Sequence, residues 1–237
     1  MYTKRSATVY DRLYWFKDYP EHASRIVESI EQAHPSASSL LEVACGTGRF
    51  LSLLGKRFAV EGLDINADML AMARASNASV PLHEADMSHF DLGRTFDVVA
   101  CLFSSIAYVR TITRFVSAIS SMARHVAPGG LLVIEPWFTP ETLFVDTITM
   151  NTYDGTDMKI CWMYTTRKVE SEARLEIEYL VGTPASVDHF TEMHRLGLFR
   201  RDDYSAAFAR ESLDLTYDSV GPARRGLYIG RRSSEPA

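Results

Sequence analysis

Apolar residues recur at intervals of three and four along the segment 19–33, with a proline near its start, and this spacing predicts a helix. A short continuous apolar run follows, and then a glycine-containing turn and a second helical stretch. Another apolar run leads into a third helical stretch, which Asn66 would cap, so a strand–helix–strand unit is complete. The predicted elements are helices over 19–33, 50–58 and 67–76 and strands over 39–44 and 59–65.

The same alternation of strands and helices continues to about residue 135. Strands that are joined through helices lie parallel to one another in a single sheet, so the pattern predicts a parallel sheet. The further elements are strands over 81–85, 96–102 and 131–135, a helix over 113–126 and a turn at 128–130.

The pattern changes after Pro136, where β-rich runs follow one another without a helical stretch between them. The runs span 147–153, 158–169, 173–181 and 189–198, and a helix over 202–211 and strands over 213–218 and 226–230 follow them. We therefore predict an α/β protein whose Rossmann-like sheet is built from residues 1–137 and 200–237. An antiparallel β-sheet over about 138–199 is inserted into it.

Composition narrows the class of protein and of partner. Of the 237 residues, 46% are hydrophobic, which suffices for a sizeable core, and the net charge of -5 comes without a long Lys/Arg run that would bind nucleic acid. The three cysteines, Cys45, Cys101 and Cys161, fit neither a disulfide framework nor a zinc site. These cysteines favour the reducing cytoplasm, and because no stretch of about 18 apolar residues occurs we expect no membrane span.

Two glycines, Gly46 and Gly48, stand where the first predicted strand passes into a helix. Glycines at this place let a ligand approach the backbone closely, although a bare Gly-x-Gly is more often only a tight turn. The loop lacks the third glycine of the dinucleotide fingerprint and the Gly-Lys-Ser/Thr of a phosphate-binding loop. An adenosine-bearing ligand of another kind is therefore favoured.

Two carboxylates follow the next predicted strands. Asp64 ends the second strand, where a carboxylate accepts hydrogen bonds from ribose hydroxyls, and Asp86 follows the third strand, where it would receive an adenine amino group. Each might instead cap a helix. Because the carboxyl ends of parallel strands meet at one edge of the sheet, the glycine loop and both carboxylates are expected to face one crevice.

These motifs together resemble the class I S-adenosylmethionine (SAM)-dependent methyltransferases. The residues that carry the resemblance are 42–48 (EVACGTG), 61–65 (EGLDI), 85–87 (ADM) and 128–130 (PGG). The resemblance implies that SAM is the cofactor, with Gly46 and Gly48 at its methionine end, Asp64 at the ribose and Asp86 at the adenine. The full set that it implies is Tyr10, Tyr19, Ala44, Gly46, Gly48, Asp64, Ile65, Met69, Asp86 and Met87. For the two methionines, ordinary core packing is an equal alternative.

A narrower resemblance, to the dTDP-3-amino-sugar N,N-dimethyltransferases, spans nearly the whole chain. It is carried by residues 10–11 (YD), 17–19 (KDY), 103–106 (FSSI), 135–137 (EPW), 140–141 (PE) and 226–227 (GL). It implies that Tyr2, Tyr108 and Arg225 position a sugar nucleotide, with packed or solvated side chains as the alternative. Lys17 and Tyr19 would close over the methionine carboxylate of the cofactor, and we favour Tyr19.

The expected chemistry needs no catalytic triad and no metal. A neutral amine is nucleophilic and a sulfonium methyl is electrophilic, so positioning and desolvation supply most of the acceleration. The seven histidines show no metal-ligand spacing, although His189 and His194 on an inserted strand might touch a substrate. We expect N,N-dimethylation of a nucleotide-linked 3-amino sugar by a homodimer. The alternatives are N- or O-methylation of another natural product and a SAM-binding protein without catalysis.

Overall fold

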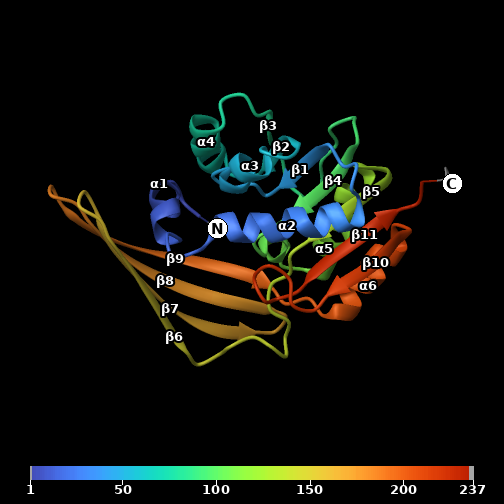
Figure 1. Ribbon diagram of the computed structural model, residues 1–237. Helices are drawn as coiled ribbons and strands as arrows, with labels where there is room; N and C mark the ends of the chain where they lie inside the picture. The colour runs from blue at the N-terminus through green and yellow to red at the C-terminus, as the bar shows by residue number, and fades with distance from the viewer. Residues whose placement is uncertain (1, 235–237) are drawn as a thin grey trace.

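The computed structural model describes residues 2–234 and contains two β-sheets (Figure 1). The larger sheet has seven strands in the order β10-β11-β5-β4-β1-β2-β3. Its strands are β1 (Ser39–Val43), β2 (Ala59–Asp64), β3 (Leu82–Glu84), β4 (Phe96–Cys101), β5 (Val126–Ile134), β10 (Leu213–Asp218) and β11 (Leu227–Arg232). Each coincides with a predicted strand to within a few residues, and the prediction of a Rossmann-like α/β fold is confirmed.

The sheet departs from the prediction at β11 and at the start of β5. β11 runs antiparallel to both of its neighbours, β10 and β5, and the short connection from β10 makes those two strands a hairpin. The predicted turn at 128–130 lies inside β5, where the pairing with β4 shifts register between Phe96 and Val98. Gly129, with a φ of 77°, accommodates the irregular backbone there.

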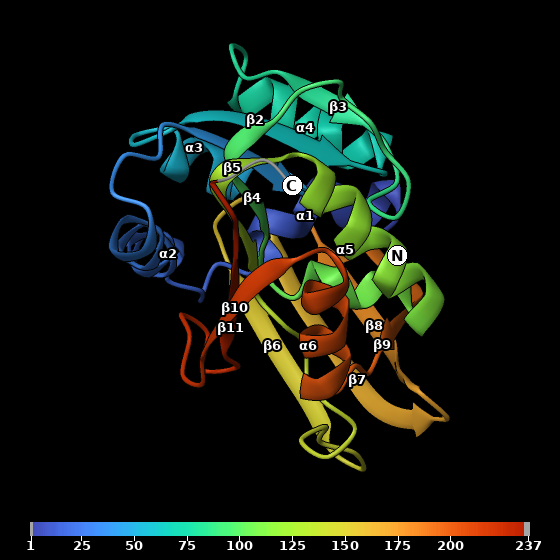
Figure 2. The same cartoon turned by 90° about the vertical axis from the view of Figure 1, so that its right-hand side faces the viewer.

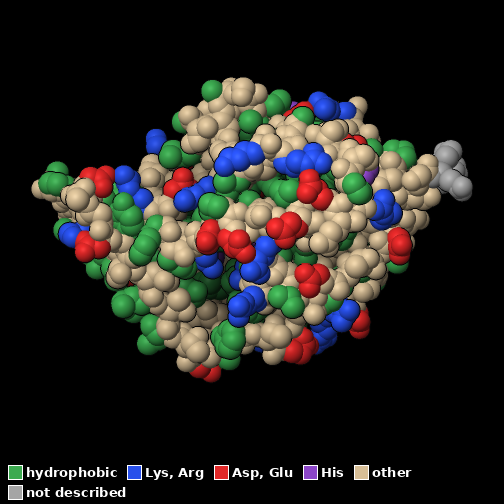
Figure 3. All heavy atoms as spheres, in the orientation of Figure 1, with side chains coloured by type: hydrophobic (Ala, Val, Ile, Leu, Met, Phe, Trp, Pro, Cys, Tyr) green, Lys and Arg blue, Asp and Glu red, His purple; other side chains and the backbone are tan. Residues whose placement is uncertain are grey.

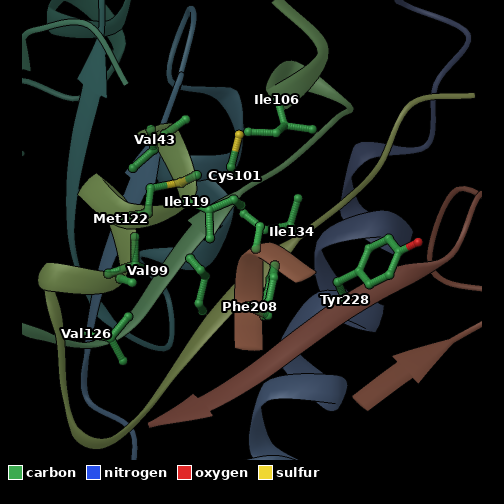
Figure 4. Close-up of a cluster of buried hydrophobic side chains, with 14 of the residues drawn as sticks. Val43, Val99, Cys101, Ile106, Ile119, Met122, Val126, Ile134, Phe208 and Tyr228 are labelled. Atoms are coloured by element: carbon green, nitrogen blue, oxygen red, sulfur yellow. The ribbon is translucent and has the colours of Figure 1, made fainter. Parts of the chain in front are cut away.

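Helices cover both faces of the larger sheet (Figure 2). The helices are α1 (Lys4–Leu13), α2 (Tyr19–Ala33), α3 (Arg49–Leu54), α4 (Ala67–Ser76), α5 (Ile112–Arg124) and α6 (Arg201–Arg210). Side chains of α2, α3 and α4 share one buried cluster with the sheet, and those of α5 and α6 share another (Figure 4). No helix among residues 2–234 combines the length and the apolar character that a membrane crossing requires.

The first helix and a short 3₁₀ turn were not predicted. The buried apolar residues of α1 are only Ala7, Val9 and Leu13, and polar and aromatic residues separate them. The sequence of this segment therefore shows no clear helical periodicity. Thr3 and Ser6 form a capping box that begins the helix. The 3₁₀ turn η1 (Ser105–Val109) follows β4 directly. Both unpredicted elements carry residues of the site described below.

The second sheet is a four-stranded antiparallel meander, β6 (Ile148–Asp154), β7 (Lys159–Val169), β8 (Glu172–Gly182) and β9 (Val187–Gly197). It extends to one side of the larger sheet, and α1 lies between it and α4 (Figure 1). Burial alternates along β7, β8 and β9, so one face of this sheet is apolar and covered. The predicted antiparallel insertion is confirmed, and its covered face lies toward the site.

Candidate active site

A cavity of about 400 Å³ lies between the carboxyl edge of the larger sheet and the covered face of the second sheet. Ten of the expected site residues line it, namely Tyr2, Tyr10, Ala44, Gly46, Asp64, Ile65, Met69, Met87, Tyr108 and Arg225. Three others, Tyr19, Gly48 and Asp86, do not. The arrangement places the glycine loop, the second-strand carboxylate and the second sheet around one space.

The glycine loop presents Gly46, and not Gly48, to the cavity. Gly46 has a φ of 56°, and a Cβ atom built there would meet no atom within 4 Å. A Cβ on Gly48 would lie 2.7 Å from the side-chain amide of Asn77, so that glycine allows the loop to pack against α4. Gly46 therefore leaves open room for a ligand beside the backbone, as the crevice prediction requires.

Asp64 is fixed at the end of β2 by the loop itself. Its Oδ2 atom accepts a hydrogen bond of 2.8 Å from the amide of Gly46, and its Oδ1 accepts one of 2.8 Å from the amide of Asn66. Burial raises the pKa of Asp64, although these and another backbone amide oppose the shift. The carboxylate is oriented at the wall of the cavity, where hydroxyl groups of a ribose would complete its hydrogen bonds.

Asp86 lies in a small recess of about 50 Å³ that shares Ala44, Asp64, Met87 and Tyr108 with the main cavity. Its Oδ2 atom accepts a hydrogen bond of 2.6 Å from Arg114. Partial burial raises the pKa of Asp86, but hydrogen bonds from Ser88 and Arg114 outweigh it and the pKa is lowered. The carboxylate is thus near the predicted place but is already paired with a cation.

Lys17, and not Tyr19, reaches the cavity. Tyr19 is 3% exposed and stacks on Phe103 at 5.6 Å, whereas Lys17 lines the cavity with Phe103 beside it. Burial and the nearby Arg225 lower the pKa of Lys17, against the influence of Glu135. Of the two side chains, that of Lys17 lines the cavity and that of Tyr19 does not.

Arg225 approaches the cavity from the loop between β10 and β11. Its guanidinium lies over the rings of Trp137 and Phe138, and its Nη2 atom is 3.8 Å from Oε1 of Glu135. Glu135 is 0% exposed, and its Oε2 atom accepts a hydrogen bond of 2.6 Å from the amide of Phe103. The contact between Arg225 and Glu135 is an ion pair without a hydrogen bond, and the buried Nε of Arg225 has no hydrogen-bond partner among the described residues.

The covered face of the second sheet forms the other wall. Its cavity-lining residues are Thr149, Asn151, Trp162, Tyr164, Leu175, Ile177, His194 and Leu196. Of these, sequence reasoning had named only His194, because strand alternation marks a covered face but not what it covers. His189, the other histidine considered, has a side chain 62% exposed on the opposite face.

Tyr14 is a further residue that was not predicted. It lines the cavity from the end of α1, and its hydroxyl lies 2.6 Å from the hydroxyl of Tyr2. Burial raises the pKa of Tyr14 to about 12, so this phenol is neutral. Because α1 itself was not predicted, no sequence signal placed Tyr14 here.

Comparison with known proteins assigns this geometry to a family. A family model described as "Methyltransferase domain" matches residues 40–130. The chain is 37% identical, over 97% of its length and 99% of the relative's, to dTDP-3-amino-3,4,6-trideoxy-alpha-D-glucopyranose N,N-dimethyltransferase of Streptomyces venezuelae. It is 34% identical, over 98% of its length and 95% of the relative's, to dTDP-4-amino-2,3,4,6-tetradeoxy-D-glucose N,N-dimethyltransferase of Saccharopolyspora spinosa.

Solved structures agree with these relatives. The crystal structure of Streptomyces venezuelae DesVI matches 96% of this chain, and 98% of that chain, with a TM-score of 0.91 and 36% identity. SAM-bound CalS10, an amino pentose methyltransferase from Micromonospora echinaspora, covers 98% of each chain with a TM-score of 0.87 and 33% identity.

Proposed function

This chain belongs to the dTDP-amino-sugar N,N-dimethyltransferases, which are SAM-dependent enzymes, and we propose that it methylates the 3-amino group of a dTDP-linked deoxysugar twice. One observation carries the proposal. A single cavity joins the Gly46 and Asp64 wall to an aromatic wall that ends at Arg225. A cofactor and a nucleotide sugar would therefore meet inside it.

The residues of the first wall fit SAM. Gly46 leaves open space beside the backbone, Asp64 holds an oriented carboxylate, and Met69, Ile65 and Met87 supply apolar surface. In our proposal Asp64 binds the ribose hydroxyls and Gly46 lies along the methionine part. Asp86 accepts three hydrogen bonds, from Ser88 and Arg114, and would use its remaining acceptor site to bind the adenine amino group. When bound, SAM supplies an electrophilic methyl group on a sulfonium.

The residues of the second wall fit a nucleotide sugar. We propose that Arg225 binds the pyrophosphate, since a guanidinium forms paired, charge-assisted hydrogen bonds with phosphate oxygens. The hydroxyls of Tyr2 and Tyr108 line the same cavity and would orient the sugar. Rings of Trp137, Trp162 and Tyr164 would exclude water from it, so that positioning and desolvation do most of the work.

We also propose a homodimer formed through the outer face of the second sheet. Exposed apolar side chains cluster on this face: Ile148, Met150, Met163, Leu180 and Met193, with exposed fractions between 40% and 72%. A patch of this kind on an open sheet is typical of a protein interface. A location in the cytoplasm stays a prediction from the three free cysteines.

A mass-spectrometric assay with purified nucleotide sugars tests the function. Wild-type protein, SAM and a dTDP-linked 3-amino sugar are expected to give monomethylated and then dimethylated product. The 4-amino isomer, the substrate type named for the Saccharopolyspora relative, should react more slowly. Product from an unrelated acceptor, with none from either amino sugar, would replace this proposal by another natural-product methyltransferase.

A further inference from the structure

A buried carboxylate and a buried histidine stand side by side on the covered face of β9. Glu192 and His194 are two positions apart, so both side chains point to the same face of the strand. They are 4% and 2% exposed. Their Oε2 and Nε2 atoms are 3.2 Å apart, and His194 also lines the cavity.

The carboxylate of Glu192 is held ionised by the N-terminal segment. Its Oε1 atom accepts hydrogen bonds from the amide of Thr3 at 2.9 Å, the hydroxyl of Thr3 at 2.5 Å and the hydroxyl of Ser6 at 2.7 Å. Burial alone would raise the pKa of Glu192, but the hydrogen bonds from His194, Thr3 and Ser6 outweigh it and lower the pKa to about 2. At neutral pH this group carries a full negative charge beside the imidazole.

The partners of His194 define its tautomer. Since Nε2 faces a carboxylate, it bears the proton and donates it, and Nδ1 is left as an acceptor. Nδ1 lies 2.8 Å from the hydroxyl of Tyr108, which donates to it. Burial lowers the pKa of His194 despite the nearby Glu192, so the ring is uncharged at neutral pH.

Tyr108 connects Glu192 and His194 to the cavity in which we propose that methyl transfer takes place. It stands on η1, lines the main cavity and shares the small recess with Ala44 and Asp64. Burial raises the pKa of Tyr108 far above the ordinary value, so the phenol is not itself a base at neutral pH. It can pass a proton on, because Tyr108 lines the cavity and its hydroxyl oxygen lies 2.8 Å from Nδ1 of His194.

We propose that Tyr108, His194 and Glu192 form a relay that removes the proton from the substrate ammonium, an inference that rests on the proposed function. The ammonium N–H bond breaks and its proton moves to the Tyr108 oxygen. The Tyr108 O–H bond breaks at the same time, and its proton moves to Nδ1 of His194. The amine is left with a free lone pair, and the imidazolium is paired with ionised Glu192.

Repeated methylation requires that a proton be removed from the amine between the two transfers, and the relay provides an acceptor for it. An amine that has received one methyl group is an ammonium and must lose a proton before it becomes nucleophilic again. A neighbouring positive sulfonium lowers the pKa of an ammonium by like-charge repulsion, which makes transfer to an imidazole easier. Once the imidazolium has released its proton to bulk water, the same acceptor can take the proton of the monomethylated ammonium, so this sugar can react again without leaving.

Variants of His194 test the relay. His194→Asn keeps an oxygen near the position of Nδ1, and His194→Gln keeps an N–H near the position of Nε2, but neither accepts a proton at neutral pH. Because a general base contributes about 10²–10⁴-fold, we expect kcat to fall about tenfold or more in both, and monomethylated sugar to accumulate. KM for the sugar and the Kd of SAM should stay within about twofold, since a relay acts on the reaction and not on binding.

His189→Asn is the matched control. His189 lies on the same strand and also contacts a glutamate, Glu178 at 2.6 Å, but on the exposed face. This variant should keep wild-type kcat and product ratio. Thermal melting of each variant shows whether it is folded.

Tyr108→Phe tests the relay independently, in case either His194 variant fails to fold. Groups that act in series are not additive, so Tyr108→Phe combined with His194→Asn should be no slower than the slower single variant. NMR of isotopically labelled histidine should show a neutral Nε2–H tautomer for His194 in wild type. In Tyr108→Phe the Nδ1 signal should shift as its hydrogen bond is lost.

Three results would overturn the relay: wild-type kcat in a folded His194 variant, a loss of binding equal to the loss of kcat, or additive losses in the double variant. If wild-type enzyme methylates no amino sugar at all, the proposed function itself fails. That outcome is separate from the three results above.

Discussion

The two walls of the cavity are built in different ways. The cofactor wall consists of backbone and short-range contacts, since Gly46 donates its amide to Asp64 across only 18 positions of the chain. The acceptor wall consists of side chains brought together over long separations, as when Thr3 and Ser6 hold Glu192. A wall made of backbone constrains one ligand, whereas a wall made of side chains can be altered residue by residue. If the first wall binds the cofactor and the second the acceptor, as we propose, the acceptor can change while the cofactor site is kept.

The surface shows no comparable division. Lys and Arg side chains are interspersed with Asp and Glu on the face in Figure 3, so no extended field of one sign marks a nucleic-acid site there. The contrast between a wall built from backbone and a wall built from side chains therefore concerns the interior of the protein. The following variants test it.

Substitution of Gly46 by valine should have the largest effect. The side chain would enter the open space of the cavity and would occupy a backbone conformation that strains a β-branched residue by about 1–3 kcal/mol. We expect SAM binding to weaken about a hundredfold or more, equivalent to about 2.7 kcal/mol, as measured by calorimetric titration. Gly93→Val is the control, because Gly93 has a φ of 65° and open surroundings but lies outside the cavity. Equal loss of binding in both variants would contradict the backbone character of the wall.

Asp64→Ala should weaken SAM binding at least about tenfold, because charge-assisted hydrogen bonds worth about 1.5–3 kcal/mol are lost. The alanine also leaves the amides of Gly46 and Asn66 without their acceptor. Asp64→Asn retains an acceptor for one of them and should be the milder change. Calorimetry that gave wild-type affinity for a folded Asp64→Ala protein would remove this residue from the cofactor site.

The same contrast between local and long-range contacts explains which features of the fold and the site could be predicted from the sequence. The order of elements from residue 19 onward and the place of Asp64 follow from periodicity and from the rule that strand ends meet at one edge. α1 was missed because aromatic and polar residues obscure its period, and with it Tyr14 was missed. That Lys17 lines the cavity while Tyr19 packs against Phe103, and that His194 lies in the cavity wall, depends on packing between distant segments, which local patterns do not encode.

Arg225→Gln should act on the acceptor wall alone. If the guanidinium binds pyrophosphate in ground and transition states alike, KM for the nucleotide sugar should rise about tenfold with kcat nearly unchanged. SAM affinity should not change. Arg224→Gln, an exposed neighbour, is the control. Steady-state kinetics with an unchanged KM would show that the nucleotide is bound elsewhere.

The walls should also differ in the pH dependence of stability, where the two carboxylates have shifts of opposite sign. Burial raises the pKa of Asp64, so its protonation does not drive acid unfolding. Glu192 has its pKa lowered from 4.5 to about 2 by its partners, despite burial. Its contribution, on the order of 3 kcal/mol, is therefore present above about pH 4.5 and lost as the pH falls toward 2.

Glu192→Gln removes the carboxylate that takes up a proton in this pH range. The free energy of unfolding should therefore decrease less between about pH 4.5 and 2 than in wild type, and it should be lower than in wild type at neutral pH. Urea unfolding at a series of pH values, followed by tryptophan fluorescence, measures both. Glu178→Gln provides the control, since Glu178 also has its pKa lowered, by Thr191 and His189, but its side chain is 49% exposed and screened by water. A Glu192→Gln profile parallel to that of wild type would show that the N-terminal contacts do not hold the charge in place. In that case, packing alone would hold the side chains of the acceptor wall in place.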